Sequence, residues 1–196
     1  SSTTSSNNVA IGSNALANLT SGTPCIAIGN NALNANTTGS NIAIGYYSLQ
    51  VNTTGAQNSA FGTETLYTNV TGSRNSAFGY RALYTSTVSD LTAIGYQALT
   101  LNTTGASNTA VGSSVLAANT TGSNSTAVGY QALTVNTTGS NAVAVGYQAL
   151  YTNVSGSRIS AFGHEASYTS TASDITAIGY HALYLTTTGA NNTAIG

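Results

Sequence analysis

The stretch Asn-Ser-Thr-Ala-Val-Gly-Tyr-Gln-Ala-Leu-Thr-Val-Asn-Thr-Thr-Gly, residues 124–139, is one copy of a pattern that fills the chain of 196 residues. Its centre, Ala followed by an apolar residue and Gly, recurs twelve times at intervals of 16 or 17 residues. The rung glycines are Gly12, Gly29, Gly45, Gly62, Gly79, Gly95, Gly112, Gly129, Gly146, Gly163, Gly179 and Gly196. A fixed short period is typical of a solenoid, in which each repeat forms one rung. We therefore expect 1–196 to be a single repeat array whose rungs contact only their neighbours.

Residue type follows position within the rung. The residue before the rung glycine is always Ile, Val or Phe, and the residue before that is always Ala. Four residues after the glycine, Leu stands in ten of eleven rungs, with Ser167 as the exception. Ten residues after it, nine of eleven rungs have a second glycine, namely Gly22, Gly39, Gly55, Gly72, Gly105, Gly122, Gly139, Gly156 and Gly189. Two glycines per rung predict two tight corners, because glycine tolerates positive φ, and two corners predict two strands.

The segments between the corners alternate with the two-residue period of strands. Helix is the alternative for residues 130–135, because Gln-Ala-Leu favours helix, but six residues are too few for a stable one. The fold class predicted is an all-β parallel β-solenoid, a two-sided β-roll of about 11 rungs of 16–17 residues. At about 4.8 Å per rung it would be on the order of 55 Å long. A three-sided β-helix fits less well, since its aliphatic residues would recur six apart.

Two apolar columns are expected to form the core. The Ile, Val and Phe residues before the glycines would face the column of Leu, and each buried side chain contributes about 1.5–3 kcal/mol. The alanine columns indicate close approach of another surface, either the opposite side of the rung or a neighbouring chain. The second reading predicts a homo-oligomer. The single cysteine, Cys25, lies among apolar residues and is read as a small buried side chain, with an intermolecular bridge or a reactive thiol left open.

Charge is scarce in this chain. Three arginines, no lysine and four acidic residues give a net charge of −1. Nucleic-acid binding is not expected, because phosphate neutralisation needs clustered Lys and Arg. Membrane insertion is not expected either, since no run of about 18 apolar residues occurs, and residues 1–8 lack the pattern of a signal peptide. The apolar residues make up 41% of the chain and recur in phase, which argues against disorder.

A longer repeat lies inside the short one. Residues 58–112 match residues 142–196 at an offset of 84 residues, which is five rungs. Most charged residues lie in this super-repeat, at positions that stacking places one above the other on adjacent rungs. The pairs predicted in this way are Arg74 with Asp90, Arg158 with Asp174, and Glu64 with Arg81. Exposed ion pairs stabilise by only about 0–1 kcal/mol, so their expected role is to set the register between rungs.

The repeats at residues 8–15, 41–45 and 124–132 follow the pattern Asn-x-x-Ala-Ile-Gly-x-x-Ala. The first two have a single residue between Asn and Ala, and the last has Val in place of Ile. They resemble the head repeats of trimeric autotransporter adhesins, and related repeats in phage and viral tail fibres. The resemblance implies a left-handed parallel β-roll assembled as a homotrimer on an extracellular fibre. The period here is longer than in adhesin heads, because an Asn-Thr-Thr-Gly insertion enlarges the outer corner.

Residues suited to catalysis or metal binding are few. The only histidines are His164, in a column rich in tyrosine, and His181, stacked on Glu165. Nucleophilic catalysis needs a base beside a nucleophile, and a metal site needs three or four clustered ligands. We therefore predict no enzyme activity, no metal site and no cofactor.

Tyrosines form two columns. Those directly after the rung glycine are the candidate recognition ladder, Tyr46, Tyr80, Tyr96, Tyr130, Tyr147 and Tyr180. The second column, four residues on, comprises Tyr67, Tyr84, Tyr151, Tyr168 and Tyr184. Stacked aromatic rings stabilise a ladder by packing, whereas exposed tyrosines are also common at recognition surfaces, including those that bind carbohydrate.

Ten Asn-x-Ser/Thr triplets are candidate glycosylation sites. They begin at Asn18, Asn36, Asn52, Asn69, Asn102, Asn119, Asn124, Asn136, Asn153 and Asn191. Seven share one corner, seven residues after the rung glycine, where turn chemistry is the alternative to a glycan. A threonine column at the same corner raises an ice-binding hypothesis. It consists of Thr37, Thr53, Thr103, Thr120 and Thr137.

The function predicted from these features is a structural segment of an extracellular fibre or filament, adhesive or exposed at a cell or virion surface. The alternatives are a glycan- or ice-binding module and a viral tail-fibre shaft. The expected partners are copies of the same chain, as a homotrimer or an end-to-end filament, together with glycans. A filament is expected because neither end of the array has a polar cap, and an uncapped β edge templates further pairing.

Overall fold

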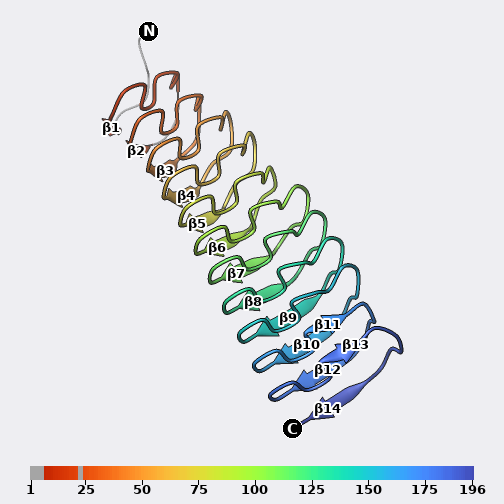
Figure 1. The fold of residues 1–196 in the computed structure, drawn as a ribbon. Helices are drawn as coiled ribbons and strands as arrows, with labels where there is room; N and C mark the ends of the chain where they lie inside the picture. Colours follow the sequence, from red (N-terminus) through yellow and green to blue (C-terminus); the bar gives the residue numbers. More distant parts are fainter. Residues whose placement is uncertain (1–6, 22–23) are drawn as a thin grey trace.

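The computed structural model describes residues 7–21 and 24–196. The chain is an all-β solenoid of about 11 turns, stacked into a rod (Figure 1). The described residues include no helix that is long and apolar enough to cross a membrane. Gly22, one of the second glycines, lies outside the described residues. So do residues 1–6, which belong to the N-terminal segment that lacks the pattern of a signal peptide.

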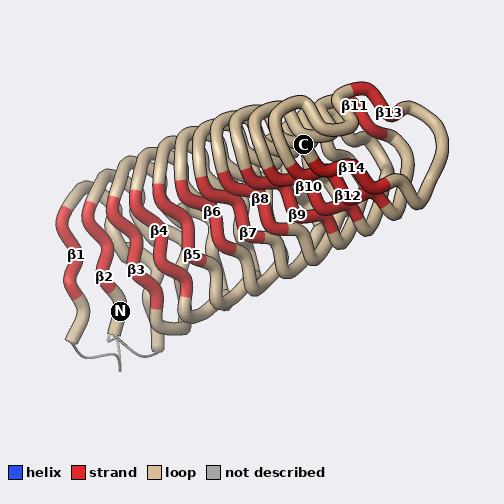
Figure 2. The backbone as a smooth tube through the Cα atoms, turned by 90° about the horizontal axis from the view of Figure 1, so that it is seen from below, coloured by secondary structure: helices blue, strands red, loops and turns tan. Residues whose placement is uncertain are grey.

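Of the fourteen strands in the described part of the chain, twelve form one parallel sheet, which lies along one side of the rod (Figure 2). Each rung adds one strand beside the preceding one, and the register aligns equivalent residues, such as Ala127 with Ala144 and Val128 with Val145. The strands are β1 (Val9–Ile11), β2 (Ile26–Ile28), β3 (Asn41–Ile44), β4 (Asn58–Phe61), β5 (Ser76–Phe78), β6 (Thr92–Ile94), β7 (Thr109–Val111), β8 (Thr126–Val128), β9 (Ala142–Val145), β10 (Ile159–Phe162), β12 (Ile175–Ile178) and β14 (Thr193–Ile195).

The other side of most rungs is a series of turns, so the predicted second strand is wrong for them. Residues at the second and fourth places after the rung glycine have left-handed φ, for example Ser114 at 55° and Leu116 at 50°. Residues of negative φ separate them, and a strand cannot hold this alternation. The Leu116 N–H donates to Ala132 O of the next rung at 3.2 Å, while the Asn119 N–H donates back to Leu116 O of its own rung at 3.2 Å.

Among the described residues, a second strand forms only near the C-terminal end. β11 (Thr169–Ser170) pairs in parallel with β13 (Leu185–Thr186), and Thr152 makes an isolated bridge to Thr169. The backbone of the remaining turn segments still bonds from rung to rung, so the rod is hydrogen-bonded on both sides although only one side is a sheet.

The core lies between the alanines of the sheet and the leucines of the turns. Ala127 and Leu133 are fully buried, whereas Val128 is 37% exposed. The predicted Leu column is therefore confirmed, but the prediction that Ile, Val and Phe face it is wrong. Because Leu fills the narrow space between the two sides, only a methyl group fits opposite. The strict alanine columns are explained by close approach within one chain, not by a neighbouring chain.

Both glycine columns are needed, for different reasons. The twelve rung glycines have φ between 125° and 145°, a region that L-residues rarely adopt. Most second glycines have no positive φ. At Gly139, an added Cβ would collide with the carbonyl of Gly156 and lie 2.6 Å from Asn136 Oδ1. Of the described second glycines, Gly39 and Gly189 alone have positive φ.

The predicted ion pairs are confirmed. Arg158 Nε and Nη2 donate to Asp174 at 2.6 and 2.8 Å, and Arg74 makes the same pair with Asp90. Arg81 Nε donates to Glu64 at 2.5 Å. Each pair joins adjacent rungs. Nearly all other contacts between rungs are uncharged, so these pairs mark register within the stack.

Cys25 is fully buried, as its apolar surroundings predicted. Its thiol donates to Gly39 O at 2.9 Å, and burial raises the pKa of the thiol. A raised pKa leaves less thiolate at neutral pH, which makes the side chain less reactive.

Candidate functional site

The outer face of the large sheet carries an apolar stripe along its whole length. We name as the outer stripe the twelve residues that precede the rung glycines, Ile11, Ile28, Ile44, Phe61, Phe78, Ile94, Val111, Val128, Val145, Phe162, Ile178 and Ile195. Strand alternation turns them outward once alanine occupies the core. Several are well exposed, among them Ile94 at 41% and Ile178 at 40%. Because contiguous exposed apolar surfaces are typical of interaction sites in soluble proteins, the outer stripe is a candidate for one.

The outer face is also hollowed towards the N-terminal end. A depression of about 540 Å³ lies over the first four strands of the sheet. Val9, Ile26 and Ile42, which stand two residues before the outer stripe, contribute apolar side chains to it. In later rungs this neighbouring column is mostly Ser or Thr, so the apolar surface is widest at this end.

The tyrosines of the candidate recognition ladder lie at the start of the turn segments, directly after their rung glycines. Tyr130 stacks on Tyr147 with centroids 5.4 Å apart, and Tyr80 stacks on Tyr96 at 5.6 Å. The exposed fractions of the six tyrosines in this ladder range from 39% to 68%, and Tyr180 is the most exposed. The ladder is interrupted where the column has Thr63 or Ser113. These tyrosine rings are stacked on one another and also exposed, so part of each ring surface stays accessible to a ligand.

The second tyrosine column is stacked more regularly. Tyr67 lies on Tyr84 and Tyr151 on Tyr168, both with centroids 5.2 Å apart. Burial is the largest cause that raises the pKa of Tyr168. This column is less exposed than the first, which fits a role in packing.

The seven corner asparagines form a buried amide ladder in two runs, which are separated by Ser86 at the equivalent position of one rung. Asn136 Nδ2 donates to Asn119 Oδ1 at 2.7 Å and to Gly139 O at 2.9 Å, and Asn153 repeats the pattern on Asn136. The side chains of Asn36, Asn52, Asn69, Asn102, Asn119, Asn136 and Asn153 are fully buried. Buried, hydrogen-bonded amides at this corner favour turn chemistry, and glycosylation of these asparagines stays a prediction.

The other three candidate glycosylation sites are exposed. Asn18, Asn124 and Asn191 lie on the surface, and the latter two have left-handed φ of 57° and 63°. Glycosylation at these three exposed positions stays a prediction. The corner threonines, by contrast, direct their hydroxyl groups at the protein, as Thr120 Oγ1 does to Thr137 O at 2.9 Å. Their hydroxyl hydrogens are therefore engaged between rungs, which weakens the ice-binding hypothesis.

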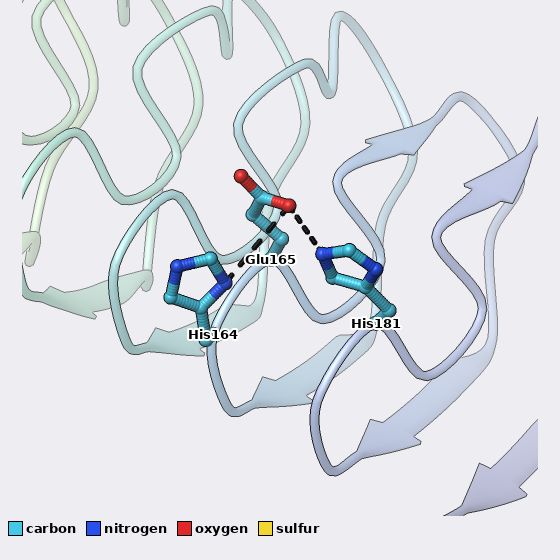
Figure 3. A group of neighbouring side chains, drawn as sticks. All are labelled: His164, Glu165 and His181. Atoms are coloured by element: carbon cyan, nitrogen blue, oxygen red, sulfur yellow. Dashed lines mark ion pairs between the residues drawn. The ribbon is translucent and has the colours of Figure 1, made fainter.

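Both histidines meet one carboxylate near the C-terminal end (Figure 3). His181 Nε2 lies 2.5 Å from Glu165 Oε2, as stacking predicted, and His164 Nδ1 lies 3.9 Å from the same oxygen. The expectation that this chain lacks three clustered candidate ligands is therefore wrong. The available signal was the pair His164-Glu165 with His181 one rung further on. Whether the side chains converge depends on rotamers, which the repeat does not specify.

Comparisons of the chain with protein-family models, with curated proteins and with solved structures yield no match.

Proposed function

We propose that the chain is a structural segment of an extracellular fibre, in which copies of the chain pack side by side through the outer stripe. The observation that carries the proposal is the unbroken apolar column on the outer face of the sheet. It includes Ile94, Val128 and Ile178, each exposed by more than a third. Burying such side chains contributes about 25 cal/mol for each Å² removed from water.

The repeat spacing supports a second copy as the occupant of this surface. Strands of one sheet lie about 4.8 Å apart, so the stripe presents one apolar side chain at each such step. A partner of the same repeat length matches that spacing over the whole rod, whereas an unrelated surface matches it locally. The resemblance to adhesin heads favours three chains, and it also supports a cell-surface or virion-surface location.

The distribution of charge supports the same proposal. The charged side chains of the super-repeat pair within one chain, and no charged residue interrupts the outer stripe. Close packing of identical chains through the outer stripe therefore brings no like charges together on this face. Lateral association of this kind produces a shaft, the form shared by a surface adhesin and a viral tail fibre.

The test is the mass of the purified chain in solution. Sedimentation equilibrium is expected to give a small multiple of the 19.6 kDa chain. The double substitution Ile94→Lys with Val128→Lys, on the outer stripe, should give the monomer. Leu101→Lys with Val154→Lys is the matched control, because both residues are exposed but lie outside the sheet, and it should keep the wild-type mass. A monomeric wild type, or equal masses for all three proteins, would contradict lateral packing.

A second candidate function is glycan recognition along the first tyrosine ladder, because Tyr96 and Tyr130 are 52% and 48% exposed in a stacked column. Flat exposed rings suit the apolar faces of sugars. A glycan array probed with the wild type and with Tyr130→Ala tests it. Binding that weakens in the variant supports recognition, and an array without ligand contradicts it.

A further inference from the structure

Two imidazoles and a carboxylate converge on one point of the surface. His164 Nδ1, Glu165 Oε2 and His181 Nε2 all lie within 4.8 Å of one another (Figure 3). Glu165 is the least exposed, with a side chain 17% accessible, while those of His164 and His181 are 47% and 39% accessible. The carboxylate thus lies at the base of the cluster, and the imidazoles are open to solvent on either side.

The backbone fixes the two rungs that carry this cluster. His164 and Glu165 follow β10 and Gly163, whereas His181 follows β12 and Gly179. The His181 N–H donates to His164 O at 3.1 Å, and the Glu165 N–H donates to Tyr147 O of the preceding rung at 2.8 Å. The side chains therefore project from positions held by rung-to-rung hydrogen bonds.

Neighbouring rings hold the imidazoles in place. Tyr147 stacks on His164 with centroids 4.9 Å apart, and Tyr180 stacks on His181 at 3.9 Å. Tyr184 also contacts the His181 ring, at 4.7 Å. Restricted imidazoles lose less conformational entropy when they bind a ligand, so the stacking favours a preorganised site.

Donors of this kind suit a zinc-type ion. Two histidine nitrogens and one glutamate oxygen are a known set for Zn²⁺, with water in the fourth position. Ligands about 2.1 Å from a tetrahedral ion are about 3.4 Å apart. An ion would therefore replace the 2.5 Å contact between His181 Nε2 and Glu165 Oε2 by moving these two atoms apart. It would draw the other two pairs together, since they are 3.9 Å and up to 4.8 Å apart.

The super-repeat contains a natural comparison. At the offset of 84 residues, the positions of His164, Glu165 and His181 are occupied by Tyr80, Arg81 and Gln97. The same two rungs therefore fold with no such donor set. All three ligand types appear together in one copy and are all missing from the other, and the chain has no further histidine.

We propose that His164 Nδ1, Glu165 Oε2 and His181 Nε2 bind one zinc-type divalent ion, with water completing its coordination. The ion joins the rung of Gly163 to the rung of Gly179. The ion stabilises the folded state, because the unfolded chain does not hold the three donors together. This stabilisation increases as the ion concentration rises above the dissociation constant.

The experiment is calorimetric titration of the tag-free 196-residue chain with Zn²⁺, accompanied by the visible spectrum of the Co²⁺ form. Wild type is expected to bind one equivalent per chain and to melt at a higher temperature with Zn²⁺. The variant His164→Tyr, Glu165→Arg, His181→Gln restores the residues of the first super-repeat and should lose at least tenfold in affinity. Circular dichroism without metal checks its fold. If it does not fold, His181→Gln alone decides, with the same expected loss.

A reciprocal variant tests whether the three residues suffice. Glu64→Gln, Tyr80→His, Arg81→Glu and Gln97→His copy the second super-repeat, which has Gln148 where the first has Glu64. This variant should bind two equivalents of Zn²⁺ per chain. Absence of saturable binding by the wild type would overturn the proposal. Equal Zn²⁺ affinity in the wild type and in a folded variant that lacks the site would overturn it as well.

Discussion

Asn136 and Asn119 are joined through their buried side chains, with Asn136 Nδ2 donating to Asn119 Oδ1 at 2.7 Å across one step of the stack. The same Nδ2 group donates to Gly139 O at 2.9 Å, which closes the corner of its own rung. One amide thus links two rungs and shapes a turn, and the arrangement recurs wherever consecutive rungs have Asn at this corner. A buried polar group of this kind is favourable only while all its partners are present.

Substitution of Asn136 by alanine should destabilise the rod. It leaves the carbonyl of Gly139, Oδ1 of Asn119 and Nδ2 of Asn153 each short of a partner. Each unsatisfied buried group costs about 1–3 kcal/mol, so a loss of at least about 2 kcal/mol in the free energy of unfolding is expected. Thr138→Ala, at an exposed residue of the same corner, is the control and should change little. Denaturant unfolding measures both, and equal effects would contradict the buried ladder.

Substitutions at neighbouring positions in β8 should distinguish the two faces of the sheet. Ala127 is fully buried and Val128 is 37% exposed. Ala127→Leu forces extra methyl groups into a filled core and should destabilise by about 1–3 kcal/mol or more. Val128→Ala should change the stability of an isolated chain by less than about 1 kcal/mol. The measurement is thermal unfolding at low concentration, and a reversed order of the two effects would place Val128 in the core.

Acid should weaken the rod through two aspartates. Hydrogen bonds from Arg74 and Arg158 hold the pKa values of Asp90 and Asp174 below their usual range. A lowered folded-state pKa gives stability that is present above the ordinary aspartate pKa of about 3.9 and lost as the pH falls further. Melting temperatures recorded between about pH 5 and 2 should therefore fall, and less steeply at high salt.

The double variant Asp90→Asn with Asp174→Asn is the comparison for this pH profile. It should be less stable than the wild type at neutral pH and should lose part of the acid-dependent decline. Parallel profiles for the two proteins would show that these pairs do not contribute to acid sensitivity.

Cys25 should react slowly with a thiol reagent while the chain is folded. The side chain is fully buried, and burial raises the pKa of the thiol, so both access and thiolate are limited. Labelling with a chromogenic disulfide at neutral pH should be complete in denaturant and orders of magnitude slower in buffer. Fast labelling in buffer would mean that the N-terminal rungs open readily.

The sequence predicted features that depend only on rung spacing. Arg74 lies over Asp90, and His181 over Glu165, because residues at equal distance from their rung glycines are stacked by a parallel register. The direction of the side chains was harder to predict. A strand that alternates Ala127 and Val128 has the same period whichever face is buried, and a one-residue shift exchanges the faces.

Hydrophobicity favours Val128 for the core, but the space opposite Leu133 admits only alanine. The second side of the rung could not be predicted for a related reason. Leu133 has φ of 53°, a conformation that local sequence preferences assign to Gly or Asn. Burial of Leu in the core, together with its hydrogen bond to the next rung, outweighs that preference, and neither can be judged within a single repeat.

Lateral packing through the outer stripe is tested most directly by distances between chains. A spin label at position 128, introduced by Val128→Cys in a Cys25→Ser background, would lie on the outer face. Sheets that pack face to face are about 10 Å apart, which places labels of neighbouring chains within range of dipolar coupling. Strong coupling is expected at this position, and weak coupling for a label introduced by Leu101→Cys. Absence of coupling between chains at position 128 would contradict the proposed assembly.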